Sequence, residues 1–211
     1  MKQYLTEAIG TFFLVFTVAL CVTQSVPLAP LAIGSVLMVM VYAGGHVSGG
    51  HYNPSVTLAA WLRGALPAKQ VVPYWFAQFV GGTLGVLIAA HITGKLLHVA
   101  PGDGVTWFPA LLAEIVFSFA LSYVVLNVAT AKETQGNSYF GLAIGFTVMV
   151  GAFAVGGISG GAFNPAVGLS PALLEVIHGH GTTAAVWIYA VGPLTGGALA
   201  AFAFRVQHPG E

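Results

Sequence analysis

The sequence predicts an all-α membrane protein in which six transmembrane helices and two re-entrant half-helices form an inverted repeat. Only 6% of the 211 residues are charged and 57% are hydrophobic, whereas a soluble domain carries about 25% charged residues. Apolar stretches of spanning length and two short segments that begin with Asn-Pro complete the pattern. The composition excludes a soluble globular protein, because lipid must be the solvent for most of the surface.

Six apolar stretches are long enough to cross a bilayer, which takes about 20 helical residues. Clusters of Pro, Gly and polar residues separate them, as is typical of turns. The expected spans are about residues 4–24, 31–48, 71–93, 107–130, 138–156 and 184–204. Two further apolar pieces, about 53–62 and 164–174, are too short to cross, so we expect half-helices there. All of these segments fit one membrane channel domain over residues 1–211.

The second half of the chain repeats the first at a spacing of 111 residues. Residues 45–56 read GHVSGGHYNPSV and residues 156–167 read GGISGGAFNPAV, and such a match indicates an internal duplication. Each copy, about 1–100 and 107–211, holds three spans. Because three is odd, the second copy enters the membrane from the opposite side, and inverted repeats bring broken helices together near the bilayer centre.

Each Asn-Pro pair indicates the start of a helix, because Asn is a strong N-cap and Pro is favoured in the first turn. Inverted symmetry places the two helix N-termini face to face, each with about half a positive charge from its peptide dipoles. Cations and protons meet a barrier there, while the Asn amides orient a passing water. The expected central constriction consists of Asn53, Pro54, Ser55, Asn164, Pro165 and Ala166.

Glycine-rich loops precede both Asn-Pro pairs and predict non-helical backbone. The carbonyls of such backbone lack helical partners, which a membrane tolerates only where they are buried in protein or line a water-filled cavity. We therefore expect a wet pore. Its lining carbonyls are expected to belong to Gly49, Gly50, His51, Tyr52, Gly160, Gly161, Ala162 and Phe163.

Glu7 and Glu114 are ionisable residues at matching places in the two copies. A proton relay is the functional alternative for such residues, but their symmetry favours buried acceptors for the loop backbone. His46 and His51 have no counterparts in the second copy. We expect His46 to be buried and hydrogen-bonded and expect no metal site, because two histidines without further ligands bind a metal weakly.

The charge pattern predicts neutral cargo and a defined orientation. The formal net charge is zero and the chain has no basic run, so nothing supports nucleic-acid binding. We expect a multi-pass protein of the cell membrane with both termini in the cytoplasm, because positive residues mark that side. In this orientation only Lys95 lies outside, and the cytoplasmic side carries Lys2, Arg63, Lys69, Lys132 and Arg205.

At these motifs the chain resembles the aquaporin, or major intrinsic protein, family. The resemblance covers the whole chain and rests on Glu114 and on residues 7–11 (EAIGT), 48–54 (SGGHYNP), 74–82 (YWFAQFVGG) and 192–197 (GPLTGG). It implies a right-handed bundle of six helices and two half-helices with one pore per subunit. It also implies a homotetramer, no cofactor and no enzyme activity.

The outer selectivity filter departs from the family pattern. Carried over by spacing from each Asn, its four positions are Ile33, Ala152, Gly161 and Val167. Water-selective members resemble one another in having a large aromatic residue, often a His, and an Arg there. Val167 stands in the place of that Arg, so the resemblance implies a wider and more apolar constriction. We expect a passive channel for water and other small uncharged solutes such as glycerol, urea or ammonia.

Three other interpretations remain open at this point. A coupled secondary transporter shares the inverted repeat but needs a coupling-ion site, and a closed or structural relative of the channels conducts nothing. The sequence GISG at 157–160, with His178 or His180 as a base, superficially resembles an intramembrane serine protease. Because the same Ser-Gly-Gly recurs at 48–50, loop geometry explains the serine better.

Overall fold

The computed structural model describes residues 1–179 and 184–210 and is helical apart from its connecting segments. Six of the described helices are long and apolar enough to cross a membrane. These are α1 (Lys2–Thr23), α2 (Ala29–Ser48), α4 (Ala68–Thr93), α5 (Trp107–Ala129), α6 (Phe140–Ser159) and α8 (Ile188–Gln207). A 3-10 turn, η1 (Lys132–Thr134), follows α5. Large apolar side chains such as Phe76 and Phe202 are exposed, as a lipid-solvated surface requires.

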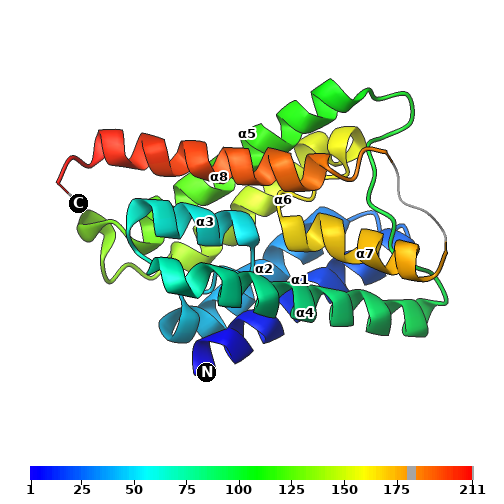
Figure 1. Ribbon diagram of the computed structural model, residues 1–211, viewed down its shortest axis with the longest axis horizontal. Coiled ribbons are helices and arrows are strands. Elements are labelled where there is room, and N and C mark those ends of the chain that lie inside the picture. The colour runs from blue at the N-terminus through cyan, green and yellow to red at the C-terminus, as the bar shows by residue number, and fades with distance from the viewer. Residues whose placement is uncertain (180–183, 211) are drawn as a thin grey trace.

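Two shorter helices, α3 (Pro54–Arg63) and α7 (Pro165–Ile177), begin where the sequence predicts half-helices. Both have an Asn N-cap followed by Pro. Gly64 ends α3 in the left-handed conformation that glycine adopts at low cost. In Figure 1 the two helices lie end to end in the middle of the bundle, between α8 above and α4 below, and run in opposite directions from their N-termini. The fold therefore holds two opposed half-helices.

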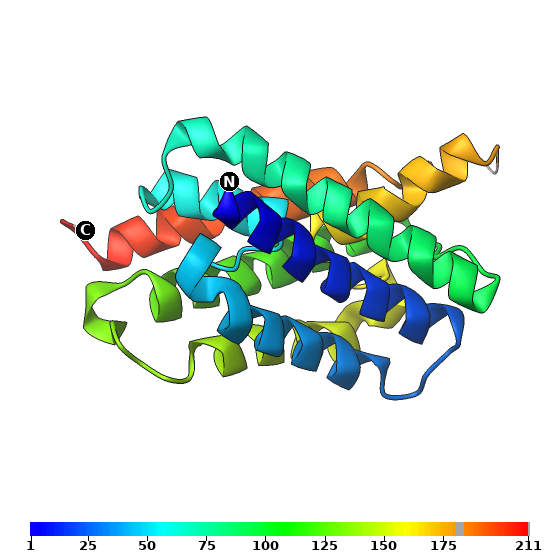
Figure 2. The same ribbon diagram turned by 90° about the horizontal axis from the view of Figure 1, so that it is seen from below.

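The two halves of the chain interlock. Within them α1 packs against α4 and α5 packs against α8, while α2 packs against α6 across the halves. Each short helix contacts the last span of the other half, α3 on α8 and α7 on α4. Both termini lie in the same half of the molecule along its long axis (Figures 1 and 2). Neither half of the chain is a complete bundle without the other, because the half-helix of each half packs against a span of the other half.

Matching glycines allow the spans to approach closely. A Cβ atom on Gly81 of α4 would lie 2.1 Å from the Ala8 carbonyl oxygen of α1, and one on Gly196 of α8 would lie 2.4 Å from the Ile115 carbonyl oxygen of α5. Small residues let helices pack closely in a membrane, where lipid gives no hydrophobic drive for association. These contacts set the spacing of the α1–α4 and α5–α8 pairs.

The sixth span begins later than predicted. Residues 184–187 form turns, α8 starts at Ile188, and the helix continues to Gln207. Hydropathy alone places the span earlier, because it counts the apolar turn as membrane and the polar end of α8 as loop. That polar end stays helical because its side chains find partners: Arg205 donates to the Leu62 carbonyl, and the Tyr123 hydroxyl donates to Gln207 Oε1 at 2.8 Å.

The prediction that His46 is buried is wrong. His46 is exposed on the last turn of α2, where Val41, Gly44 and Ser48 form the buried face. The buried positions recur at helical spacing, and His46 falls on the opposite side of the helix from Gly44. The proximity of His46 to the SGGHYNP motif at 48–54 therefore does not predict whether its side chain is buried.

Gly197 of α8 faces α3, and we expect Gly197→Ala to destabilise the fold by about 1–3 kcal/mol through overpacking. An added Cβ would lie 2.5 Å from Ser55 Oγ and 2.6 Å from the Ser55 carbonyl oxygen. The thermal unfolding midpoint of the protein in detergent measures the effect. Gly157→Ala is the matched control, because a Cβ on this helical glycine meets nothing within 4 Å. Equal midpoints for the two variants would contradict the packing account.

Candidate functional site

Asn53 and Asn164 cap the two half-helices in the same way. Both residues have extended backbone, with φ of −158° and −157°. Asn53 Oδ1 accepts a hydrogen bond from the Ser55 N–H at 2.8 Å, and Asn164 Oδ1 accepts one from the Ala166 N–H at 2.9 Å. Each cap satisfies one of the backbone donors that a helix start leaves without a partner.

The amide groups of the same two residues connect the halves. Asn53 Nδ2 donates to the Phe163 carbonyl and Asn164 Nδ2 donates to the Tyr52 carbonyl, each at 2.9 Å. An amide NH₂ has two hydrogens, so each Asn retains one for a molecule beside it. The exchange of hydrogen bonds fixes both helix N-termini at one place.

Glu7 of α1 holds the loop that leads into α3. Its carboxylate accepts from the Ser48 hydroxyl at 2.7 Å, the His51 N–H at 3.0 Å and the Tyr52 N–H at 2.7 Å. The Glu7 side chain is fully buried. A buried carboxylate needs such donors to compensate for lost hydration.

Glu114 of α5 makes the same contacts in the second half. It accepts from the Ser159 hydroxyl at 2.7 Å, the Ala162 N–H at 3.0 Å and the Phe163 N–H at 2.7 Å. Neither Glu7 nor Glu114 is among the described residues that line the cavity presented below, and these hydrogen bonds are the ones expected of acceptors for the loop backbone.

Tyr52 and Phe163 have left-handed backbone, with φ of 50° and 48°. This conformation is costly for a bulky residue and persists only where the surroundings enforce it. The carboxylates bind both N–H groups, and glycines make room for the rings. A Cβ on Gly10 or Gly44 would lie 2.1 Å from the Tyr52 side chain, and one on Gly151 would lie 2.8 Å from Phe163.

Further hydrogen bonds support the loops, and sequence reasoning assigned no role to their donors. The Tyr74 hydroxyl donates to the Ser48 carbonyl at 2.8 Å, and the Tyr189 hydroxyl donates to the Ser159 carbonyl at 2.6 Å. The presence of a tyrosine at the matching position of each half indicates this shared role. Gln78 has no such counterpart, because proline stands at the equivalent position of the second half. The Gln78 amide donates to Glu7 Oε2 at 2.8 Å.

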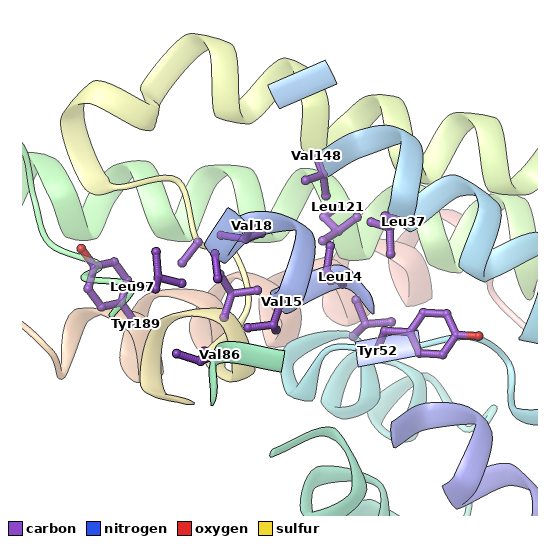
Figure 3. Packing of buried hydrophobic residues seen from close by; sticks show 14 of the residues in the cluster. Leu14, Val15, Val18, Leu37, Tyr52, Val86, Leu97, Leu121, Val148 and Tyr189 are labelled. Carbon is purple, nitrogen blue, oxygen red and sulfur yellow. The ribbon is translucent and has the colours of Figure 1, made fainter. Parts of the chain in front are cut away.

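A cavity of about 310 Å³ runs between the half-helices and the spans. This is many times the roughly 15 Å³ that one water requires. Apolar side chains from four spans converge on it, and Figure 3 shows Leu14, Leu37, Leu121 and Val148 grouped together. The described lining contains no Asp, Glu, Lys or Arg. Its polar side chains are those of four residues: His51, Asn53, His98 and Asn164.

The structure brings all four predicted filter positions to this one cavity. The lining includes Ile33, Ala152, Gly161 and Val167. It also includes three other loop residues whose carbonyls we expected in the pore, namely His51, Gly160 and Ala162. Gly49, Gly50, Tyr52 and Phe163 are described residues outside the lining. For Tyr52 and Phe163 the reason is clear, because the Asn amides bind their carbonyls.

The protease interpretation has no support from the site. The Ser159 hydroxyl is buried, donates to Glu114 and accepts from the Gly161 N–H at 3.1 Å. His178 contacts the Leu174 carbonyl of its own helix at 2.7 Å, and His180 lies outside the described residues. Ser159 therefore serves the loop, as its duplication at Ser48 indicates.

Comparison with known proteins agrees with this architecture. A family model described as Major intrinsic protein matches residues 1–204. Putative aquaporin NIP4-1 of Arabidopsis thaliana is 35% identical over 217 residues, which cover 97% of this chain and 74% of that relative. Probable aquaporin TIP2-2 of Oryza sativa subsp. japonica is 34% identical over 219 residues, which cover 97% of this chain and 86% of that relative.

A solved structure shares the fold. The aquaglyceroporin from Plasmodium falciparum matches with a TM-score of 0.83 at 18% sequence identity. The match covers 96% of this chain and 94% of that one. At this identity the likeness establishes the architecture of the bundle.

Six apolar spans around a cavity between two opposed half-helices define a multi-pass membrane channel. The chain belongs to the major intrinsic protein family. Members of this family are passive channels for water and small solutes and are not enzymes. The expected fold and the expected passive channel for water and small solutes are therefore confirmed.

We expect Glu114→Gln to destabilise the protein by about 1.5–3 kcal/mol, the contribution of a hydrogen bond to a charged group. The amide has one accepting oxygen in place of two and turns a donor toward the loop N–H groups. Thermal unfolding in detergent measures the loss. Glu133→Gln is the control, because Glu133 is exposed on η1. Its carboxylate lies 3.8 Å from His208 Nδ1, and such an exposed contact contributes little. A midpoint for Glu114→Gln equal to that of the control would show that the carboxylate does not hold the loop.

Proposed function

We propose that the cavity conducts water and other small uncharged solutes, with Asn53 and Asn164 at the central constriction. The observation that carries this proposal is the lining itself. Both Asn residues and all four filter positions face one cavity whose described lining contains no charged carboxylate, ammonium or guanidinium group. A neutral lining with a few hydrogen-bonding groups suits neutral cargo.

The filter formed by Ile33, Ala152, Gly161 and Val167 admits small solutes larger than water as well as water itself. An Arg side chain would fill space and present five donors at this constriction. Val167 supplies a short apolar side chain there instead, and Ala152 and Gly161 take little volume. Glycerol, urea and ammonia are therefore included among the proposed solutes. A coupled transporter is disfavoured, because the described lining offers no carboxylate to bind a coupling ion.

We further infer one channel domain over residues 1–211, built from inverted repeats at about 1–100 and 107–211. The matched hydrogen bonds of Glu7 and Glu114 support the repeat, and the distribution of positive residues favours cytoplasmic termini.

A homotetramer in the cell membrane follows from the family resemblance. The carbonyls of the loop residues that line the cavity, His51, Gly160, Gly161 and Ala162, are proposed as acceptors along the path.

Val167→Arg tests the filter. In vesicles reconstituted with the full chain, we expect glycerol and urea permeability to fall at least about tenfold, because the guanidinium narrows the pore. Stopped-flow light scattering under a solute gradient measures both permeabilities. Val176→Arg is the matched control, because Val176 lies on the same half-helix but is 59% exposed.

Two results would count against the proposal. Unchanged glycerol and urea permeability in Val167→Arg would show that the filter lies elsewhere. A wild-type chain that shrinks vesicles no faster than empty vesicles, under an osmolyte that cannot cross, would overturn conduction itself.

A further inference from the structure

One end of the cavity carries a polar side chain that the Asn-Pro motifs do not explain. His98 belongs to the segment between α4 and α5 and lines the cavity, with 54% of its side chain exposed. This segment is anchored on both sides of His98. Leu97 is buried, and the Gly102 N–H donates to the Ile158 carbonyl at 3.1 Å. His98 is thus held beside the path.

His98 and His51 lie on opposite sides of the central Asn pair. Lys95, near His98, donates to the Thr23 carbonyl at the end of α1, whereas the His51 N–H donates to Glu7 near the start of α1. Helix rise separates Glu7 from Thr23 by about 24 Å. Of the described residues that line the cavity, His98 is therefore the single one with a polar side chain on the Thr23 side of the central Asn pair.

Glu175 orients the His98 ring. Its Oε1 atom lies 2.5 Å from His98 Nδ1, and its side chain is only 10% exposed. Glu175 belongs to α7, the half-helix that also carries Asn164 and Val167. One rigid helix thus bears the central amide, the filter position without Arg and the carboxylate that holds the histidine.

The pair determines which ring nitrogen offers a lone pair. An ionised carboxylate accepts hydrogen bonds and donates none, so Nδ1 carries the hydrogen in this contact. In the neutral ring the other nitrogen, Nε2, is then an acceptor. With the ring neutral, the mouth of an otherwise apolar constriction has one acceptor in a fixed position.

We propose that His98, positioned by Glu175, determines solute specificity at this mouth by accepting a hydrogen bond from an O–H or N–H group of a small uncharged solute. The inference rests on the proposed conduction through the cavity and deepens it. A solute with several donors loses hydrogen bonds to water before it passes Ile33, Ala152 and Val167, and an unpaired polar group is costly in such surroundings. The Nε2 acceptor replaces one of the lost bonds.

The alternative is a partly exposed ion pair that only tethers the segment, and such pairs contribute little. The two roles differ in what they predict for transport. A tether changes the stability of the segment without favouring one solute, whereas an acceptor changes the permeability of donor-bearing solutes relative to water.

The test measures glycerol and water permeability of the full chain in the same vesicle preparation. We expect His98→Ala to lower the ratio of glycerol to water permeability about fivefold, the equivalent of one hydrogen bond. Glu175→Ala is expected to lower the ratio as well, because the ring is no longer oriented. Glu175→Gln keeps an oxygen that accepts from Nδ1–H and should restore most of the ratio.

His178→Ala is the matched control, because His178 follows α7 and bonds to its own helix. Its ratio should equal that of the wild type. A wild type that conducts water, with an unchanged or raised ratio in His98→Ala, overturns the role of His98 and leaves the proposed function standing. A wild type that conducts nothing overturns the proposed function, and the specificity role falls with it.

A second readout does not depend on conduction. The ¹⁵N spectrum of the imidazole rings, with the His98 signal assigned from its loss in His98→Ala, reports which nitrogen carries the hydrogen. We expect the Nδ1–H form in the wild type and a mixture of forms in Glu175→Ala. The Nε2–H form in the wild type, or a ring with hydrogens on both nitrogens, would overturn the proposal whatever the permeability ratios are.

Discussion

The arrangement of the channel depends on two buried carboxylates that bind backbone N–H groups of non-helical loops. Glu7 and Glu114 each accept two loop N–H groups and one serine hydroxyl within 3.0 Å. In a membrane such loops have no water to satisfy them, so their polar groups must be bound by protein or line a cavity. The carboxylates bind the N–H groups, and the loops then deliver each half-helix to the centre of the bundle with its N-terminus inward.

Both halves of the chain hold their half-helix with a buried carboxylate, and the Asn caps then connect the two halves. The amide of each Asn cap binds the carbonyl that precedes the other cap, so neither half-helix is placed independently. The helices pack across the two halves in the same way, because α3 packs on α8 and α7 packs on α4. The result is a neutral cavity whose polar side chains are confined to a few places, while apolar walls from the spans separate them.

The sequence is sufficient to predict the spans, the half-helices, the Asn caps and the loop acceptors Glu7 and Glu114, because duplication shows each feature twice. The unsymmetrical features escape prediction. His46 is exposed because helical register decides its side, and Gln78 serves Glu7 without a counterpart. The contact of His98 with Glu175 joins residues distant in the chain, and neither belongs to a motif. The late start of α8 escapes hydropathy, because residues 184–187 are apolar but form turns.

Two opposed half-helices, each with about half a positive charge at its N-terminus, are expected to exclude protons from the conducting path without a filter Arg. Vesicles that contain both the wild-type chain and a pH-sensitive dye test it directly. Shrinkage under an osmolyte measures water, and the dye measures protons across a pH gradient. The account predicts shrinkage well above that of empty vesicles, with a proton leak equal to theirs. A proton leak that rises with the amount of protein would contradict it.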